Sequence, residues 1–185
     1  MRQLVISLLL LCAISITPSA QACVGRTLFL GISGTPREIL FAEIVSQLVT
    51  ERTGTTVKIL QFKDSAELYN AIKKGEVGIL VESTDRALQI LKRKEDNSGQ
   101  AYDLVKEEYR KSLNLVWLKP FGTPHLLAPV ISVDTIGHLP ALPKLLNKLA
   151  GILNDDSYNR LLKSLKSDEK PRRIAHDFLK AKKLI

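Results

Sequence analysis

The stretch TLFLGISGTPRE, residues 27–38, decides the fold class of this chain. Residues 27–32 form a short apolar run bounded by glycine and serine, which is typical of a strand buried on both faces. Thr35, Pro36 and Glu38 then combine a capping box with a proline at the first helical position. The stretch therefore predicts a strand, a tight turn and a helix in direct succession.

The alternation of strands and helices continues through the first half of the chain. Further strands are predicted over residues 56–60 and 77–81, with one helix capped by Asp64 and the next by Ser83 or Thr84. Strand–helix–strand–helix–strand at this spacing indicates right-handed crossovers between parallel strands. The fold class is therefore α/β with a mostly parallel sheet.

The second half of the chain is expected to extend the sheet and then to close with helices. Its pattern predicts a helix over 102–112, a strand over 115–118, a second apolar run over 126–133, and C-terminal helices from Leu139, from Asn154 or Asp155, and after Pro171.

The first 22 residues have the organisation of a secretory signal peptide. Arg2 supplies a positive start, residues 4–16 are apolar, and Ala20-Gln21-Ala22 is a small-residue cleavage site. A bilayer span needs roughly 20 apolar residues, so this run is too short to be one. Since nothing caps or patterns it as a buried helix, we predict a periplasmic protein whose single domain covers residues 23–185.

Cleavage at this site leaves Cys23 as the first residue and as the remaining cysteine of the exported chain. No internal disulfide is then available. Two interpretations stay open for Cys23: an N-terminal lipid anchor, or a free thiol. The residues before it match an ordinary cleavage site better than a lipoprotein signal.

The chain is basic, with a formal net charge of +8, and the excess gathers at the C-terminus. Residues 160–185 hold nine lysines and arginines against three acids. Nucleic acid is excluded as a partner, because the protein is predicted to be exported and no aromatic residues interleave with the basic ones for base stacking. A solvated helix face is the favoured interpretation, and a weak contact with an anionic membrane surface is the alternative.

Catalytic and metal-binding patterns are missing from the sequence. His125, His138 and His176 have no ligand spacing, and neither a Cys-x-x-Cys pair nor a nucleophile elbow occurs. The glycines at Gly31 and Gly34 lack the lysine of a phosphate-binding P-loop. We therefore predict no enzyme activity, no cofactor and no metal.

Ligand binding is instead expected where the first and third strands end. Sheets of this kind bind ligands in a crevice at the carboxyl ends of their strands. Two loops offer hydroxyl groups and free N–H groups there, and their residues are the predicted ligand contacts for a small polar solute: Ser33, Gly34, Thr35, Glu82, Ser83 and Thr84. Glu82 fits two roles equally, a contact or general base in the crevice and a cap of the following helix.

Several stretches in order resemble the glycine betaine/choline-type substrate-binding proteins of ABC transporters. The most specific are YDLVKEEY at 102–109 and LVWLKPFG at 115–122; the others are TLFLG at 27–31, ELYNAIKKGEV at 67–77, LPALPKLLNKLAG at 139–151 and AHDFL at 175–179. The resemblance implies a three-layer domain like a periplasmic binding protein, a solute as ligand, and the membrane component of an ABC transporter as partner.

Two departures from that family shape the functional expectation. The first-lobe pattern runs to Gly122 and the C-terminal pattern resumes near His125, so the chain is expected to form one lobe where the family has two. Residues 81–85 read VESTD where the family has Pro-Glu-Tyr-Thr-Gly, so Ser83 replaces an aromatic residue that would hold a quaternary amine. We expect altered or lost betaine and choline binding. The alternative is an adaptor that docks on a partner, or forms a homodimer, through the former inter-lobe face.

Overall fold

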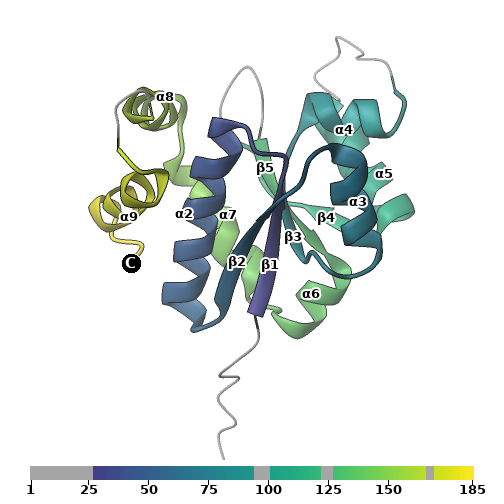
Figure 1. Ribbon diagram of the computed structural model, residues 1–185, viewed down its shortest axis with the longest axis horizontal. Coiled ribbons are helices and arrows are strands. Elements are labelled where there is room, and N and C mark those ends of the chain that lie inside the picture. The colour runs from purple at the N-terminus through teal and green to yellow at the C-terminus, as the bar shows by residue number, and fades with distance from the viewer. Residues whose placement is uncertain (1–26, 94–100, 122–126, 166–168) are drawn as a thin grey trace, which may run out of the picture.

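The computed structural model describes residues 27–93, 101–121, 127–165 and 169–185 (Figure 1). The predicted signal peptide, Cys23 and His125 lie outside the described residues. Within them, the chain forms one lobe around a five-stranded sheet, as the sequence predicted. The order across the sheet is β2 (Thr56–Gln61), β1 (Thr27–Ile32), β3 (Ile79–Ser83), β5 (Leu127–Ser132) and β4 (Leu115–Trp117).

Strand directions confirm the mostly parallel sheet. β1 pairs in parallel with both β2 and β3, whereas β5 is antiparallel to β3 and to β4, so β5 alone runs against the others. The bridge between Phe121 and Leu127 extends the β4–β5 pairing, with N–O distances of 2.9 and 3.1 Å. The chain thus returns to the same sheet after only five residues, and this short connection joins the first-lobe pattern to the C-terminal pattern.

Helices cover both faces of the sheet, which gives the predicted three layers (Figure 1). One face carries α2 (Pro36–Thr53), α7 (Leu142–Ile152), α8 (Asp155–Ser164) and α9 (Pro171–Ala181). The other carries α3 (Ser65–Lys73), α4 (Thr84–Ile90) and α5 (Ala101–Leu113), while the short α6 (Val133–His138) follows β5.

β1 is buried on both faces, as its apolar run predicted. Leu30 and Ile32 pack into the core beneath α2. On the opposite face, α3 comes so close that a Cβ at Gly31 would lie 2.4 Å from Cδ1 of Leu68. The strand therefore lies between two hydrophobic cores, and packing on both sides holds its carboxyl end in place.

The capped start of α2 is confirmed in detail. The Thr35 hydroxyl accepts a hydrogen bond from the Glu38 backbone N–H at 3.3 Å, and the Glu38 carboxylate accepts one from the Thr35 N–H at 3.2 Å. Gly54, with a φ of 71°, ends the helix and donates to the Thr50 carbonyl. Local chemistry at both ends accounts for the bounds of this helix.

Three boundaries differ from the sequence-based expectation, and one of them is the start of α7, which lies at Leu142 rather than at Leu139. The third strand is Ile79–Ser83 rather than 77–81, so Glu82 and Ser83 belong to its end and not to a loop. The strand expected from the apolar run over 126–133 ends at Ser132, because α6 begins at Val133 and the Ser132 side chain caps it by accepting from the Thr135 N–H at 3.1 Å.

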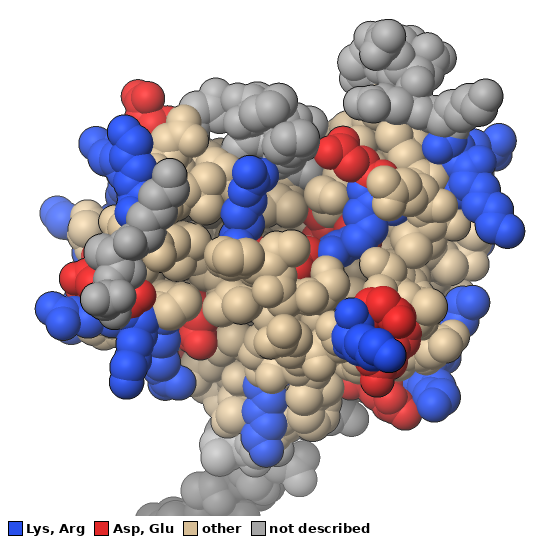
Figure 2. All heavy atoms as spheres, turned by 45° about the horizontal axis from the view of Figure 1, so that its top comes forward, with Lys and Arg blue, Asp and Glu red and all other residues tan. Residues whose placement is uncertain are grey.

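The basic C-terminal helices present their charges to solvent. Arg172, Arg173, Lys180 and Lys182 are exposed on or beside α9, while Ile174 and Leu179 of the same helix are buried against the rest of the domain. Figure 2 shows lysine and arginine side chains in blue on the left of the molecule, where the C-terminal helices lie in Figure 1. The expectation of a solvated basic face is confirmed, and the contact with an anionic membrane surface stays a prediction.

Candidate functional site

The turns that follow β1 and β3 meet at the carboxyl ends of these neighbouring strands. Gly34 shapes the first turn with a φ of +93°, and a Cβ there would lie 2.2 Å from Nε2 of Gln61. The backbone angle favours glycine at this position, and the Gln61 side chain would have to move to admit a Cβ. The turn brings the Ser33 hydroxyl to the Glu38 carboxylate, where it donates at 3.0 and 3.1 Å.

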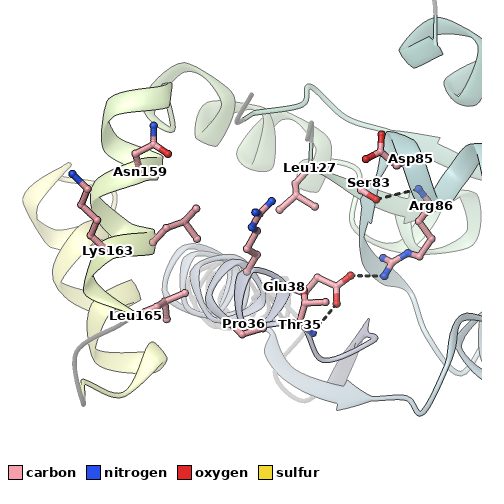
Figure 3. A pocket seen from close by; sticks show the side chains of 12 residues that line it. Thr35, Pro36, Glu38, Ser83, Asp85, Arg86, Leu127, Asn159, Lys163 and Leu165 are labelled. Atoms are coloured by element: carbon pink, nitrogen blue, oxygen red, sulfur yellow. Dashed lines mark hydrogen bonds and ion pairs between the residues drawn. The ribbon is translucent and has the colours of Figure 1, made fainter. Parts of the chain in front are cut away.

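A buried ionic network joins the two turns at this point (Figure 3). The Arg86 guanidinium forms ion pairs with Glu38 through Nη1 and with Glu82 through Nε. Its Nη1 also donates to the Ser33 hydroxyl, and its Nη2 donates to the Val81 carbonyl at 2.6 Å. Side-chain exposure is 16% for Arg86, 5% for Glu38 and 0% for Glu82, so the charges pair largely out of water.

Two tyrosines support the network from the α3 and α5 side of the sheet. The Tyr69 hydroxyl donates to Oε2 of Glu82 at 2.5 Å and lies 2.5 Å from the Tyr109 hydroxyl. The rings of these tyrosines meet edge to face, with centroids 6.1 Å apart. Glu82 is therefore held on one side by Arg86 and on the other by a buried phenol.

Burial dominates the titration of these groups. It raises the pKa of Glu82 above its usual range, against the opposing effect of Arg86, Tyr69 and the Ser83 N–H. Burial alone would lower the pKa of Arg86, but the adjacent Glu82 and Glu38 carboxylates hold it above the ordinary value. Burial, together with the negative charge of Glu82, also raises the pKa of Tyr69 and Tyr109. Arg86 is thus charged, and both phenols are protonated, at neutral pH.

A cavity of about 980 Å³ opens beside the network. One wall comes from the two turns and includes Thr35, Ser83 and the outer side of Arg86. Across the cavity, α8 contributes Asn159, Leu162 and Lys163. Figure 3 shows Asn159 and Lys163 on this helix, across the cavity from the turns that carry Thr35 and Ser83. Among the residues that the structure describes, no aromatic side chain lines this cavity.

The six predicted contact residues take different places around this cavity. Thr35 and Ser83 line it, and each also caps a helix, with Ser83 accepting from the Arg86 N–H at 3.2 Å. Ser33 and Glu82 enter the ionic network behind the wall. Thr84 is buried, and its hydroxyl oxygen has no hydrogen-bond partner among the described residues. Gly34 shapes the turn.

One alternative for Glu82 is wrong. The cap of α4 is the Ser83 side chain, not Glu82. Sequence reasoning also missed Arg86 as a member of the site and treated Glu38 only as part of a capping box. The signal available was the spacing of four residues between Glu82 and Arg86, which brings side chains together at a helix start. That signal is weak because surface helices share it.

Neither a metal cluster nor a membrane-spanning helix is found in the described part of the chain. It contains no group of three or more potential metal ligands among its histidine, cysteine and acidic residues. Every helix within it is too short or too polar to cross a bilayer.

Comparison with solved structures shows which fold this is. A crystal structure of a glycine betaine/carnitine/choline ABC transporter protein matches with a TM-score of 0.75 and 11% identity, over 85% of this chain and 99% of that one. Apo YehZ from Escherichia coli matches with a TM-score of 0.76 and 13% identity, over 87% and 100%. Lactococcal OpuAC, in its closed form with glycine betaine, matches with a TM-score of 0.50 and 8% identity, over 86% and 97%.

Comparison of the sequence with known families gives a match to a family model. No curated protein matches the chain. The family model described as the substrate binding domain of the ABC-type glycine betaine transport system, OpuAC, matches residues 26–126, which include β1, the capped start of α2 and the whole ionic network. This family is a substrate-binding component of transporters and not a family of enzymes. Since the match covers more than half of the sequence, the chain belongs to the family of substrate-binding domains of ABC-type glycine betaine transport systems.

Proposed function

We propose that this protein is an exported solute-binding lobe associated with ABC-type import, and that its ligand is not a quaternary amine. The observation that carries the proposal is the Arg86 guanidinium, which pairs with Glu38 and Glu82 at the carboxyl ends of β1 and β3. Quaternary ammonium groups are held by aromatic faces. Here the cavity wall offers an arginine and small hydroxyl residues instead.

A small polar solute fits this cavity better than an apolar one. The Thr35 and Ser83 side chains on its wall carry hydroxyl groups, and Asn159 on α8 adds an amide from the opposite side. Leu127 and Leu162 supply apolar surface between them. Polar groups placed beside apolar surface in this way are typical of small-molecule sites.

The six predicted residues act in this proposal at two distances from the solute. Thr35 and Ser83 contact it directly, whereas Ser33 and Glu82 hold Arg86 in position behind the wall. Gly34 keeps the first turn open, and the unpartnered Thr84 hydroxyl is available to a ligand that reaches it. No catalytic step is assigned to any of them, because the Ser33 hydroxyl faces the Glu38 carboxylate, and both this carboxylate and that of Glu82 are already paired with Arg86.

Export and attachment complete the proposal. Residues 1–22 direct the chain to the periplasm, where Cys23 carries either a lipid anchor or a free thiol, and the membrane component of an ABC transporter is the partner. Mass spectrometry of the N-terminal peptide decides between the two forms of Cys23. An intact residue 1 in the periplasmic protein would contradict cleavage after Ala22, and recovery of the protein from the cytoplasmic fraction alone would contradict export.

A solute panel measured by thermal shift tests the ligand class on protein purified from the periplasmic fraction. Glycine betaine, choline and carnitine should leave the melting temperature unchanged, while at least one solute among amino acids, small carboxylates and sugars should raise it. Tight choline binding would refute the proposal. Thr35→Ser retains the hydroxyl and serves as the matched control for Thr35→Val.

The adaptor or homodimer alternative is favoured by a different observation. The cavity between the sheet end and α8 has apolar wall residues, Leu127 and Leu162, which a partner or a second copy could cover. Light scattering during size-exclusion chromatography separates a monomer from a dimer. A stable dimer that responds to no solute would favour this alternative over solute capture.

A further inference from the structure

Arg86 occupies a place where a free cation could bind. We infer that the Glu38 and Glu82 carboxylates, with the Ser33 hydroxyl and the Val81 carbonyl, form a binding site for a guanidinium cation that the chain fills with its own Arg86. The inference rests on the proposed function only in placing this site at the wall of the solute cavity.

The contacts describe a site for a planar cation with several N–H donors. Nε of Arg86 faces Glu82, Nη1 faces Glu38 and Ser33, and Nη2 faces the Val81 carbonyl. All three guanidinium nitrogens thus have oxygen partners. A fixed fork of N–H groups fits such a set, whereas a spherical or fully methylated cation offers no matching donors.

Residues far apart in the sequence build the site around the arginine. Ser33 and Glu38 belong to the turn after β1 and the first turn of α2, whereas Val81 and Glu82 lie at the end of β3. Glu82 is held independently of Arg86, because it also accepts from the Tyr69 hydroxyl at 2.5 Å and from the Ser83 N–H at 2.8 Å. Glu38 is likewise tied to the Thr35 N–H and the Ser33 hydroxyl. The two carboxylates should therefore stay in place when the arginine side chain is removed.

Burial explains why the site needs a cation at all times. Two carboxylates with side-chain exposures of 5% and 0% face the same point. Without a positive partner, they would be desolvated next to each other, which strongly disfavours the folded state. An arginine in the same chain supplies that partner at an effective concentration that no free solute reaches. Cationic solutes that enter the cavity consequently find Glu38 and Glu82 already paired.

Rescue of Arg86→Ala by guanidinium ions tests this inference. The variant leaves the α4 backbone and its Ser83 cap intact, so the fold should persist at a lower melting temperature. Guanidinium at about ten times its dissociation constant should then raise the melting temperature by about 3–6 °C in a saturable manner. Urea, which is neutral, tetramethylammonium, which has no N–H groups, and sodium chloride at equal ionic strength should produce no such rise.

Two comparisons make the test specific. The wild type and Arg93→Ala should show no such rise in melting temperature, because Arg86 still fills the site in both and Arg93 is 55% exposed and pairs with Glu108 only at 4.0 Å. Arg86→Ala/Glu38→Gln/Glu82→Gln should fold and also fail to respond, because it lacks both carboxylates. If Arg86→Ala does not fold, Arg86→Ala/Glu82→Gln has one buried charge fewer and should retain a weaker response through Glu38.

The outcomes separate this inference from the proposed function. A folded Arg86→Ala protein that guanidinium does not stabilise, or an equal response in Arg93→Ala, would overturn the inference and leave the solute panel untouched. Tight binding of choline by the wild type would refute the proposed ligand class. It would not change the expected result of the Arg86→Ala rescue, which tests the inference separately.

Discussion

Replacing Arg86 with methionine should be among the most destabilising single changes in this lobe. The substitution keeps much of the side-chain volume but leaves the Glu38 and Glu82 carboxylates buried without their cation. Removal of one partner from a buried ion pair typically costs about 3–5 kcal/mol. Arg86→Met should therefore lower the free energy of unfolding by about 3–5 kcal/mol, or the melting temperature by roughly 6–20 °C for a domain of this size.

Urea unfolding followed by circular dichroism measures this loss on protein purified from the periplasmic fraction. Arg93→Met is the matched control, because its half-exposed pair with Glu108 should contribute less than about 1 kcal/mol. Arg86→Met/Glu38→Gln/Glu82→Gln should recover most of the lost stability. In that variant the amides keep the cap of α2 and the Tyr69 bond, while the uncompensated charges are gone.

A small effect of Arg86→Met on stability would refute this reasoning. If Arg86→Met unfolds within about 1 kcal/mol of the wild type, the guanidinium does not neutralise the carboxylates in the folded state. A triple variant less stable than Arg86→Met would show that packing of the side chains, and not their charge, dominates at this point.

Three further predictions follow from other parts of the structure. Gly34→Ala should destabilise the lobe by about 1–3 kcal/mol, because a side chain is strained at its φ of +93°. Gly137→Ala, in open space, should be neutral or slightly stabilising, and equal effects of the two variants in urea unfolding would contradict the turn geometry. Thr84→Val should leave stability unchanged or raise it, because it removes a buried hydroxyl that has no partner among the described residues, and a panel solute that loses affinity for this variant would place Thr84 in the site. Burial raises the pKa of Tyr69 and Tyr109, so the folded state holds their protons more tightly and loses stability as pH rises through and above about 10. In denaturant all the tyrosines should form phenolate near pH 10, as absorbance at 295 nm reports, and the same full amplitude near pH 10 in the native protein would contradict the burial of Tyr69 and Tyr109.

The turn after β1 could be predicted because its chemistry is local. Thr35 and Glu38 are three residues apart, and their reciprocal hydrogen bonds depend on the geometry of one helix start. Ser83 was one of two candidate caps for α4 for the same reason. The convergence of these turns followed from the crossover rule, which places the carboxyl ends of neighbouring parallel strands at one edge.

The function of Arg86 could not be predicted in this way. In the sequence, Arg86 and Glu82 are an ordinary pair of opposite charges four residues apart. On a helix surface such a pair stabilises the helix by only a few tenths of a kcal/mol. The second partner of Arg86, Glu38, precedes it by 48 residues. The pair becomes part of a buried network only because the folded chain brings Glu38 to Arg86 beneath the wall of the cavity.

The far wall of the cavity is a second feature that local patterns did not predict. The periodicity of residues 155–164 indicates a helix, but not that α8 lies opposite the turns after β1 and β3. The antiparallel direction of β5 was equally hidden, because an apolar run reads the same in both directions.

The sequence by itself determined where strands and helices form, because hydrophobic period and helix caps act over a few residues. It also indicated the family. The tertiary structure alone decided which charges meet, because burial of Glu38, Arg86 and Glu82 arises when separate turns close on one another. Electrostatic pairing depends on distance and on exclusion of water, and neither quantity exists until the sheet and its helices have come together.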